Sequence, residues 1–187
     1  QILDRLLVYL KKKQHRCLVF SQFVGVLDIV QDLLELRGYE YERLDGNVPA
    51  EERFRAINNF QKTKKARTTP EDPWCFLLST KAGGVGLNLN AADTVIFLDA
   101  DWNPQNDIQA MARCHRIGQS KPVRVICLIG RYTVEQHMHA RVREKLKYTD
   151  KVMGNDVAKL TAVDLLSMIK QSLGSLREQR QANQLKL

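Results

Sequence analysis

Residues 75–88 read Cys-Phe-Leu-Leu-Ser-Thr-Lys-Ala-Gly-Gly-Val-Gly-Leu-Asn, an apolar run that passes directly into a glycine-rich run. Four consecutive apolar residues, 75–78, are typical of a strand that is buried on both faces of a sheet. The glycines that follow allow backbone N–H groups to approach a ligand closely. The stretch therefore predicts a buried strand that ends in a binding loop.

Strand-like and helix-like patterns alternate on both sides of this stretch. Apolar runs predict strands at 17–20, 39–44, 75–78, 94–98 and 123–129, and helical spacing predicts helices at 2–13, 23–37, 49–60, 104–115 and 133–148. Gly38 stands where a glycine commonly ends a helix. Strands separated by helices favour right-handed βαβ units, so we expect an α/β fold with a parallel sheet.

The chain has 187 residues, 44% of them hydrophobic, which is enough for one core of ordinary size. We expect one domain over residues 1–150 and a helical or partly disordered C-terminal extension over 151–187. The first residue is Gln1 rather than Met, so we expect a piece of a longer protein. No apolar run approaches the ~20 residues of a membrane span, and we expect no membrane partner.

The net charge of +8 predicts a polyanionic partner, nucleic acid before membrane, although a lysine-rich solvated surface is the alternative. None of the four cysteines forms a Cys-x-x-Cys pair, and we expect all of them to be reduced. Asp99 and Asp101 follow an expected strand and could be a metal pair, but we expect them to terminate the strand instead. No metal site is predicted.

A second informative stretch, residues 109–119, reads Gln-Ala-Met-Ala-Arg-Cys-His-Arg-Ile-Gly-Gln. Arg113 and Arg116 are three residues apart, so on the helix expected at 104–115 they would share one face, roughly 5–6 Å apart at Cβ. Two guanidinium groups held in this way can clamp a phosphate chain through bidentate bonds. Bridges to surface carboxylates are the alternative.

The other parts of a nucleotide site are missing from the sequence. A dinucleotide fingerprint that begins at Gly84 would need Gly or Ala at position 89, which is Leu89. A phosphate-binding loop of the Gly-x-x-x-x-Gly-Lys-Ser/Thr type is absent, and so is an Asp-Glu cluster after a strand that would hold magnesium. The chain therefore has a candidate arginine clamp without the residues that cradle the β- and γ-phosphates.

This combination resembles the second RecA-like lobe of superfamily 2 helicase-type motors and, among these, the SNF2 family of chromatin remodelling ATPases, closest to the ISWI and CHD branches. The resemblance covers residues 1 to about 150. It implies a RecA-like parallel sheet flanked by helices and a nuclear location. The stretches that carry it, in family order, are Leu18–Phe23, Tyr41–Gly46, Leu78–Asn88, Ala92–Ile96, Asp101–Pro104 and Gln109–Gln119.

The resemblance also implies roles for individual residues on the nucleotide side. Gln109, Arg113 and Arg116 match a motif that completes an ATP site from across a cleft, with the two arginines as fingers. Gly86 and Asn88 match positions that approach the nucleotide. The ATP would be bound with Mg²⁺, whose protein ligands belong to an N-terminal lobe that is absent from this sequence.

Other matching positions imply contacts with double-stranded DNA and with the nucleosome. Contacts to the DNA backbone are implied for Ser21, Gln22, Gly46, Ser79, Thr80 and Lys81, and Trp102 matches a position on the DNA track. Such contacts grip phosphate without reading sequence. An acidic stripe at i, i+4 and i+7 of one expected helix matches a surface that receives the tail of histone H4, although a solvated helix face is the alternative. The stripe consists of Asp28, Asp32 and Glu35.

We therefore expect half of a DNA-dependent ATPase: the second motor lobe of a double-stranded DNA translocase that remodels nucleosomes and is inactive without the N-terminal lobe. The alternative is a stand-alone, non-catalytic module that binds DNA or histone tails. An α/β metabolic enzyme has little support, because no nucleophile–base set is present. ATP turnover by the isolated chain would exclude both of the first two readings.

Overall fold

A computed structural model describes residues 1–46, 48–62, 72–82, 87–101 and 103–149. The chain divides into two compact units, Gln1–Leu128 and Ile129–Leu187. The first unit contains the whole sheet, and in the second the described part is the helix α5 (Val134–Thr149) and the turn before it. The C-terminal extension expected at 151–187 lies outside the described residues.

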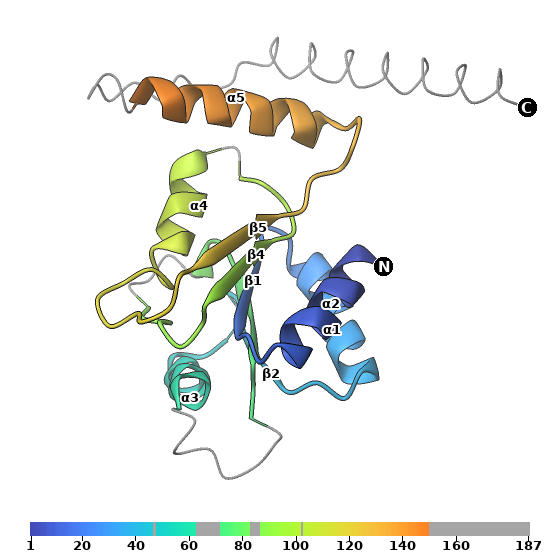
Figure 1. Ribbon diagram of the computed structural model, residues 1–187. Helices are drawn as coiled ribbons and strands as arrows, with labels where there is room; N and C mark the ends of the chain where they lie inside the picture. The colour runs from blue at the N-terminus through green and yellow to red at the C-terminus, as the bar shows by residue number, and fades with distance from the viewer. Residues whose placement is uncertain (47, 63–71, 83–86, 102, 150–187) are drawn as a thin grey trace, which may run out of the picture. The chain divides into compact units, whose positions relative to one another are not determined.

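The first unit is built on a five-stranded sheet in the order β2-β3-β1-β4-β5 (Figure 1). All four strand pairs are parallel, which confirms the predicted α/β architecture. The central strand β1 is entirely buried, as its unbroken apolar run predicts. The strands are β1 (Cys17–Ser21), β2 (Tyr41–Leu44), β3 (Cys75–Ser79), β4 (Thr94–Phe97) and β5 (Arg124–Cys127).

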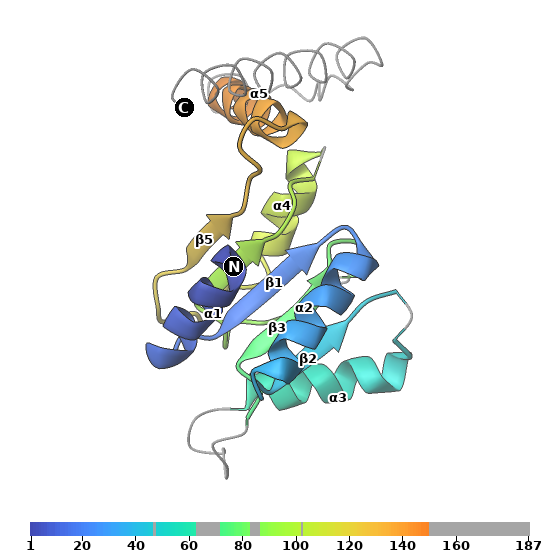
Figure 2. The same ribbon diagram turned by 90° about the vertical axis from the view of Figure 1, so that its right-hand side faces the viewer.

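Helices cover both faces of the sheet (Figures 1 and 2). On one face, α1 (Ile2–Lys12) and α2 (Val24–Leu36) pack their leucines against Cys17 and Val19 of β1. On the other face, α3 (Ala50–Gln61) and α4 (Pro104–Met111) pack against Leu18 and Phe20. The alternation of β1 side chains between two apolar clusters follows from the two-residue period of a strand.

Two features of the helices can be compared directly with the sequence. Gly38, just beyond α2, has a φ of +61°, so the predicted helix-ending glycine is confirmed. The helix expected at 104–115 ends at Met111 instead, which corrects that prediction. The helix stops because the Arg113 carbonyl accepts a hydrogen bond from Leu89 N at 3.0 Å, and Gly118 turns the chain with a φ of +100°.

A buried carboxylate organises the end of the sheet at which the strands begin. Asp93, just before β4, accepts hydrogen bonds from His15 Nδ1 at 3.1 Å, Lys121 Nζ at 3.0 Å and Thr94 Oγ1 at 3.0 Å. Burial by itself would raise the pKa of Asp93, but the hydrogen bonds from Lys121, His15 and Thr94 hold that pKa below its ordinary value. Asp93 is therefore an ionised anchor between the first unit's loops.

The turn that precedes α5 is held by short-range hydrogen bonds of its own. Thr133 Oγ1 donates to Gly130 O at 2.7 Å, and Glu135 accepts from Gly130 N at 2.8 Å.

In the parts of the chain that the structure describes, no helix has the length and apolar character needed to cross a membrane.

Candidate functional site

Hydrogen bonds between side chain and backbone join the carboxyl ends of β1 and β4. Asp99, which is 8% exposed, accepts from Ser21 Oγ and, at 2.8 Å, from Gln22 N. Gln22 Nε2 donates to Ala100 O at 2.7 Å. Asp99 thus terminates its strand by binding the neighbouring one, and the hydroxyl of Ser21 is directed inward.

The carboxyl end of β3 lies beside that of β1, because Thr80 N donates to Ser21 O at 3.1 Å. Ser79 is buried, and its Oγ accepts from Ala82 N at 3.2 Å. Thr80 Oγ1 is buried without a hydrogen-bond partner among the described residues, whereas Lys81 is exposed. Backbone and side chains of β1 and β3 therefore meet at one edge of the sheet.

This carboxyl edge, defined by the ends of β1 to β4, gathers the described residues for which DNA contacts are predicted. Gly46 is exposed and is the second residue after the end of β2. Gln22 is partly buried, and its amide is engaged with the β4 end. Trp102 lies outside the described residues. Parallel strands thus bring together positions that are up to about sixty residues apart in the sequence. The carboxyl ends of parallel strands are also where ligands bind in open α/β sheets.

The start of α4 lies at the same edge and carries further carboxylates. Asp101 Oδ1 accepts from Asn103 N at 2.8 Å, and Asp107 Oδ2 accepts from Asp101 N at 3.3 Å. The pKa of Asp107 is raised to about 6. Burial is the largest cause, the charges of Asp101 and Asp99 add to it, and the hydrogen bond from Asp101 N opposes it. A crowded group of acids thus underlies the predicted DNA track.

The segment after α4, residues 112–119, is here called the arginine turn. Arg113 is partly buried and Arg116 is exposed, and because no helix continues through them they do not share a helical face. Cys114 is buried and donates from Sγ to Ala92 O at 2.8 Å, and its burial raises the pKa of the thiol to about 12. Gln109 is exposed on the last turn of α4.

The arginine turn lies against the segment that contains Asn88. Leu89 N donates to Arg113 O at 3.0 Å, so the backbone next to Asn88 lies against that of Arg113, while their common nucleotide site stays a prediction. Asn88 is exposed, and its carbonyl accepts from Gln61 Nε2. Gly86 lies outside the described residues.

The segment that follows Asn88 leads from the α3–α4 face to the edge at which the strands begin. Leu89, Ala92 and Cys114 belong to the apolar cluster beneath α3 and α4. Asp93 N and Thr94 N donate to Arg16 O, immediately before β1, so this segment descends to the edge at which strands begin. Gly83, Gly84 and Gly86 of the glycine-rich run lie outside the described residues, and Leu89 and Ala92 of the segment that follows pack on the α3–α4 face of the sheet.

The acidic stripe is exposed on α2, but part of its charge is engaged within the domain. Asp28 pairs with Arg43 Nη2 of β2 at 2.6 Å. Glu35 accepts from the Tyr41 hydroxyl at 2.6 Å and from Gln31 Nε2 at 3.0 Å, which lowers the pKa of Glu35. Asp32 is exposed and has no hydrogen bond or ion pair among the described residues.

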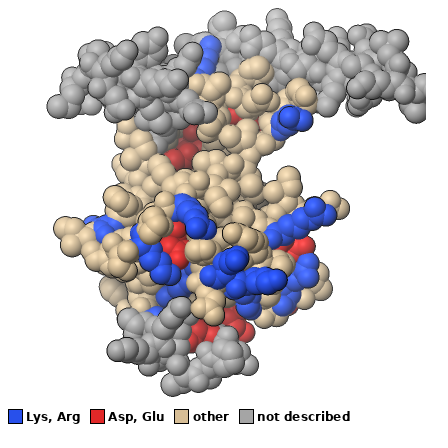
Figure 3. All heavy atoms as spheres, in the orientation of Figure 1, with Lys and Arg blue, Asp and Glu red and all other residues tan. Residues whose placement is uncertain are grey.

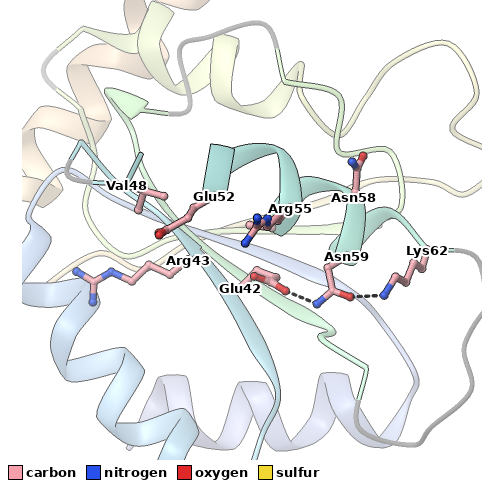
Figure 4. Close-up of a pocket in the computed structure, with 9 residues that line it drawn as sticks. Glu42, Arg43, Val48, Glu52, Arg55, Asn58, Asn59 and Lys62 are labelled. Atoms are coloured by element: carbon pink, nitrogen blue, oxygen red, sulfur yellow. Dashed lines mark hydrogen bonds between the residues drawn. The ribbon is translucent and has the colours of Figure 1, made fainter. Parts of the chain in front are cut away.

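A shallow pocket of about 530 Å³ lies between β2 and α3 (Figure 4). In it Asn59 Nδ2 donates to the half-buried carboxylate of Glu42, and Lys62 Nζ donates to Asn59 Oδ1 at 2.8 Å. Burial raises the pKa of Glu42, partly offset by the hydrogen bond from Asn59. None of the predicted site residues lines this pocket.

Basic and acidic side chains are mixed on the face of the molecule that Figure 3 shows. Figure 3 shows basic side chains spread over the face in view, with acidic side chains between them. Within the described ranges, no group of three or more His, Cys, Asp or Glu side chains is arranged to hold a metal ion.

The model of the helicase conserved C-terminal domain matches residues 1–118. The chain belongs to this family. It is 57% identical over 152 residues to the zebrafish (Danio rerio) "Chromodomain-helicase-DNA-binding protein 1-like", covering 81% of this chain and 14% of that protein. It is 45% identical over 175 residues to the human "SWI/SNF-related matrix-associated actin-dependent regulator of chromatin subfamily A member 1", covering 90% and 16%.

The fold comparison agrees with the sequence comparison. A solved structure, the C-terminal part of the Fun30 ATPase domain, matches with a TM-score of 0.67 and 38% identity, over 74% of this chain and 43% of that one. The chain is therefore a RecA-like helicase C-terminal lobe of the SNF2 family of remodellers, as its motifs predict. It spans only about one seventh of the length of the first of these curated relatives.

Proposed function

We propose that this lobe is the second motor half of an ATP-dependent translocase that moves double-stranded DNA and thereby remodels nucleosomes in the nucleus. ATP and Mg²⁺ would bind between it and the N-terminal ATPase lobe of the same protein, which would hold the metal. The observation that carries the proposal is the presence of two separate polar sites in one lobe. One is the carboxyl edge, and the other is the arginine turn with Asn88.

The arginine turn has the chemistry that a triphosphate requires. Its predicted contacts come from two guanidinium groups and from the neutral amides of Gln109 and Asn88, so no carboxylate among them opposes a polyanion. Phosphoryl transfer spreads negative charge over the γ-phosphoryl oxygens, and an arginine that arrives when the lobes close stabilises that charge. In known arginine-finger systems this raises the rate by ~10³–10⁵-fold.

The test of the nucleotide side uses the ATPase that carries both lobes. Arg113→Ala or Arg116→Ala should lower kcat by at least ~10²-fold with little change in nucleotide affinity, since a finger acts mainly in the transition state. Arg→Lys should restore little, because a point charge lacks the fork geometry. Arg5→Ala, an exposed arginine on α1, is the matched control. A near-normal kcat in either alanine variant would remove that arginine from the proposal.

The carboxyl edge is the proposed DNA side. Gln22, Gly46, Thr80 and Lys81 reach or approach the surface there, while the inward hydroxyls of Ser21 and Ser79 would act by shaping the backbone. Contacts of this kind carry no sequence information, so binding should be indifferent to sequence and should weaken steeply with salt.

Fluorescence anisotropy with two unrelated duplexes over a salt series tests the DNA side. Lys81→Ala should reduce the log–log salt slope by about one unit, whereas Lys12→Ala on α1 should not. Thr80→Ala and Trp102→Ala remove no charge, so they should weaken binding or uncouple translocation from hydrolysis and leave the slope unchanged. Strong discrimination between the duplexes, or unchanged binding and translocation in all three edge variants, would reject this edge as the DNA track.

The acidic stripe is the proposed contact for the basic tail of histone H4. Asp32 is the most informative position, because Asp28 also pairs with Arg43 and its reversal would place a lysine beside that arginine. Asp32→Lys should weaken stimulation of ATPase activity by nucleosomes and spare stimulation by naked DNA. Equal loss with both substrates would contradict the histone contact.

The chain alone should show no DNA-stimulated ATP hydrolysis, because every proposed phosphate ligand lies on one side of the site. A steady-state assay of the isolated chain with and without duplex DNA measures this. Robust turnover would mean that a complete site lies within these 187 residues.

A further inference from the structure

We propose that Gln61 and Gln119 are positioning residues for the arginine turn, a role that rests on the nucleotide function proposed above. Gln61 is the last residue of α3, and Gln119 is the last residue of the arginine turn. The two glutamines are therefore far apart in the sequence. Their side-chain amides bind the backbone of one short segment, residues 88–92, from two directions.

Gln119 connects the arginine turn to this segment directly. Its Nε2 donates to Asn90 O at 3.0 Å and Ala92 O at 2.6 Å, and more weakly to Cys114 O at 3.3 Å. Its Oε1 accepts from Lys121 N at 3.0 Å. One partly buried amide therefore fixes both sides of the turn that carries Arg113 and Arg116.

Gln61 holds the same segment from α3. Its Nε2 donates to Asn88 O, and its Oε1 accepts from Ala91 N at 3.1 Å, so the one amide bridges both sides of the turn at residues 88–91. Leu89 N, between these two bonds, donates to Arg113 O. A displacement of residues 88–91 would therefore move the backbone of Arg113 itself.

The need for such a clamp follows from the local backbone. Residues 112–119 have no helix or strand of their own, and the exposed Arg116 side chain is long and flexible. An arginine finger acts only when its guanidinium reaches the transition state, and a misplacement of about 1 Å can cost ~10²-fold in rate. Amides suit this role because they donate and accept together without adding a charge beside the nucleotide.

The experiment combines kinetics with exchange. In the two-lobe ATPase, Gln119→Met and Gln61→Met keep the side-chain length but remove the donor and the acceptor. Each should lower kcat about tenfold, less than loss of a finger, and leave DNA affinity unchanged. Gln105→Met, an exposed glutamine on α4, should keep kcat near normal. In the chain by itself, the Leu89 amide should exchange with solvent at least ~10-fold faster in Gln119→Met, with β1 amides unchanged.

A double-mutant cycle separates positioning from general damage. In a background that carries both Arg113→Ala and Arg116→Ala, Gln119→Met should lower kcat less than about threefold, because its effect passes through the two lost arginines. An equal loss in both backgrounds, unchanged kcat in both glutamine variants, or unchanged Leu89 exchange would overturn the proposal. Failure of the underlying function looks different: the arginine variants themselves would keep their kcat.

Discussion

Asp107 on α4 offers a test that needs only this chain. Its carboxyl has a pKa raised from 3.8 to about 6, first by burial and then by the nearby charges of Asp101 and Asp99. Its Oδ1 is buried without a hydrogen-bond partner in the described part of the chain. The ionised form therefore costs stability, and Asp107→Asn should relieve that cost.

The magnitude follows from the size of the change in pKa. A rise from 3.8 to about 6 corresponds to at most ~3 kcal/mol, at about 1.4 kcal/mol for each tenfold change in proton affinity. Because the side chain is only partly buried, solvent screening reduces this, and we expect a gain of about 1–2 kcal/mol. For a chain of this size, that gain is a rise in Tm of about 3–6 °C.

The raised pKa of Asp107 also determines how the stability gained by Asp107→Asn should change with pH. A group whose pKa is higher in the folded state contributes its stability fully below 3.8 and loses it as the pH rises through about 6. The gain from Asp107→Asn should therefore be complete at pH 7.5 and close to zero near pH 4. The Asn side-chain oxygen can still accept from Asp101 N, so no hydrogen bond needs to be lost.

Urea denaturation at pH 7.5 and pH 4 measures both values. Asp32→Asn removes the same charge from an exposed position on α2 and is the matched control for net charge. An equal gain at both pH values, an equal gain in the control, or a loss at pH 7.5 would refute the reasoning that the charge of Asp107 is what destabilises the fold.

Three further predictions concern the scaffold and can be followed by urea denaturation. Asp93→Asn should lower the free energy of unfolding by about 2 kcal/mol at pH 7. This loss should shrink toward pH 3, because the pKa of Asp93 is lower in the folded state: the ionised carboxylate stabilises the fold fully above pH 3.8, and this stabilisation is lost as the pH falls through the pKa of the folded state. Gly38→Ala should cost about 1 kcal/mol because of its positive φ, whereas Gly25→Ala, in α2 with open space around it, should stabilise by up to about 1 kcal/mol. Ser21→Ala should cost about 1–3 kcal/mol by removing a donor from a buried carboxylate, and Thr80→Ala, whose hydroxyl has no partner in the described part, should cost less; equal losses would contradict the inward bonding.

The three central strands of the sheet, β1, β3 and β4, could be predicted because they are short apolar runs that are buried on both faces. Apolar runs such as 17–20 and 75–78 have no other stable place in a protein of this size. The helices followed from spacing and from Gly38, which fits the end of α2. The sequence predicted a parallel sheet but no strand order, and the order β2-β3-β1-β4-β5 comes from the structure.

The end of α4 could not be predicted, because the sequence through His115 remains compatible with a helix. The helix is interrupted by partners that are distant in sequence: the Leu89 amide takes the carbonyl of Arg113, and Cys114 binds Ala92 O. Tertiary hydrogen bonds outweigh the weak local preference for helix here. The same limit hid the clamps formed by Gln61 and Gln119, because a glutamine that binds a distant backbone has the same sequence signal as one on the surface.

The inward direction of the Ser21 hydroxyl also escaped the sequence. A serine at the carboxyl end of a strand can face solvent or bind a neighbouring strand, and its type does not distinguish the two. Asp99, which the sequence predicts only as a strand terminator, decides the matter by accepting from Ser21 Oγ and Gln22 N. A residue implied as a DNA contact can therefore act by holding the backbone that makes the contact.

Connections along the chain between the two proposed sites suggest how DNA and nucleotide can be coupled. Two chain segments leave the carboxyl edge and end at the arginine turn. One runs from Thr80, bonded to Ser21 O, to Leu89, bonded to Arg113 O, and the other is α4. Because the first segment is hydrogen-bonded at both of its described ends, we expect a shift that DNA imposes at Thr80 to displace the backbone of Arg113, which is the coupling that a DNA-stimulated ATPase requires.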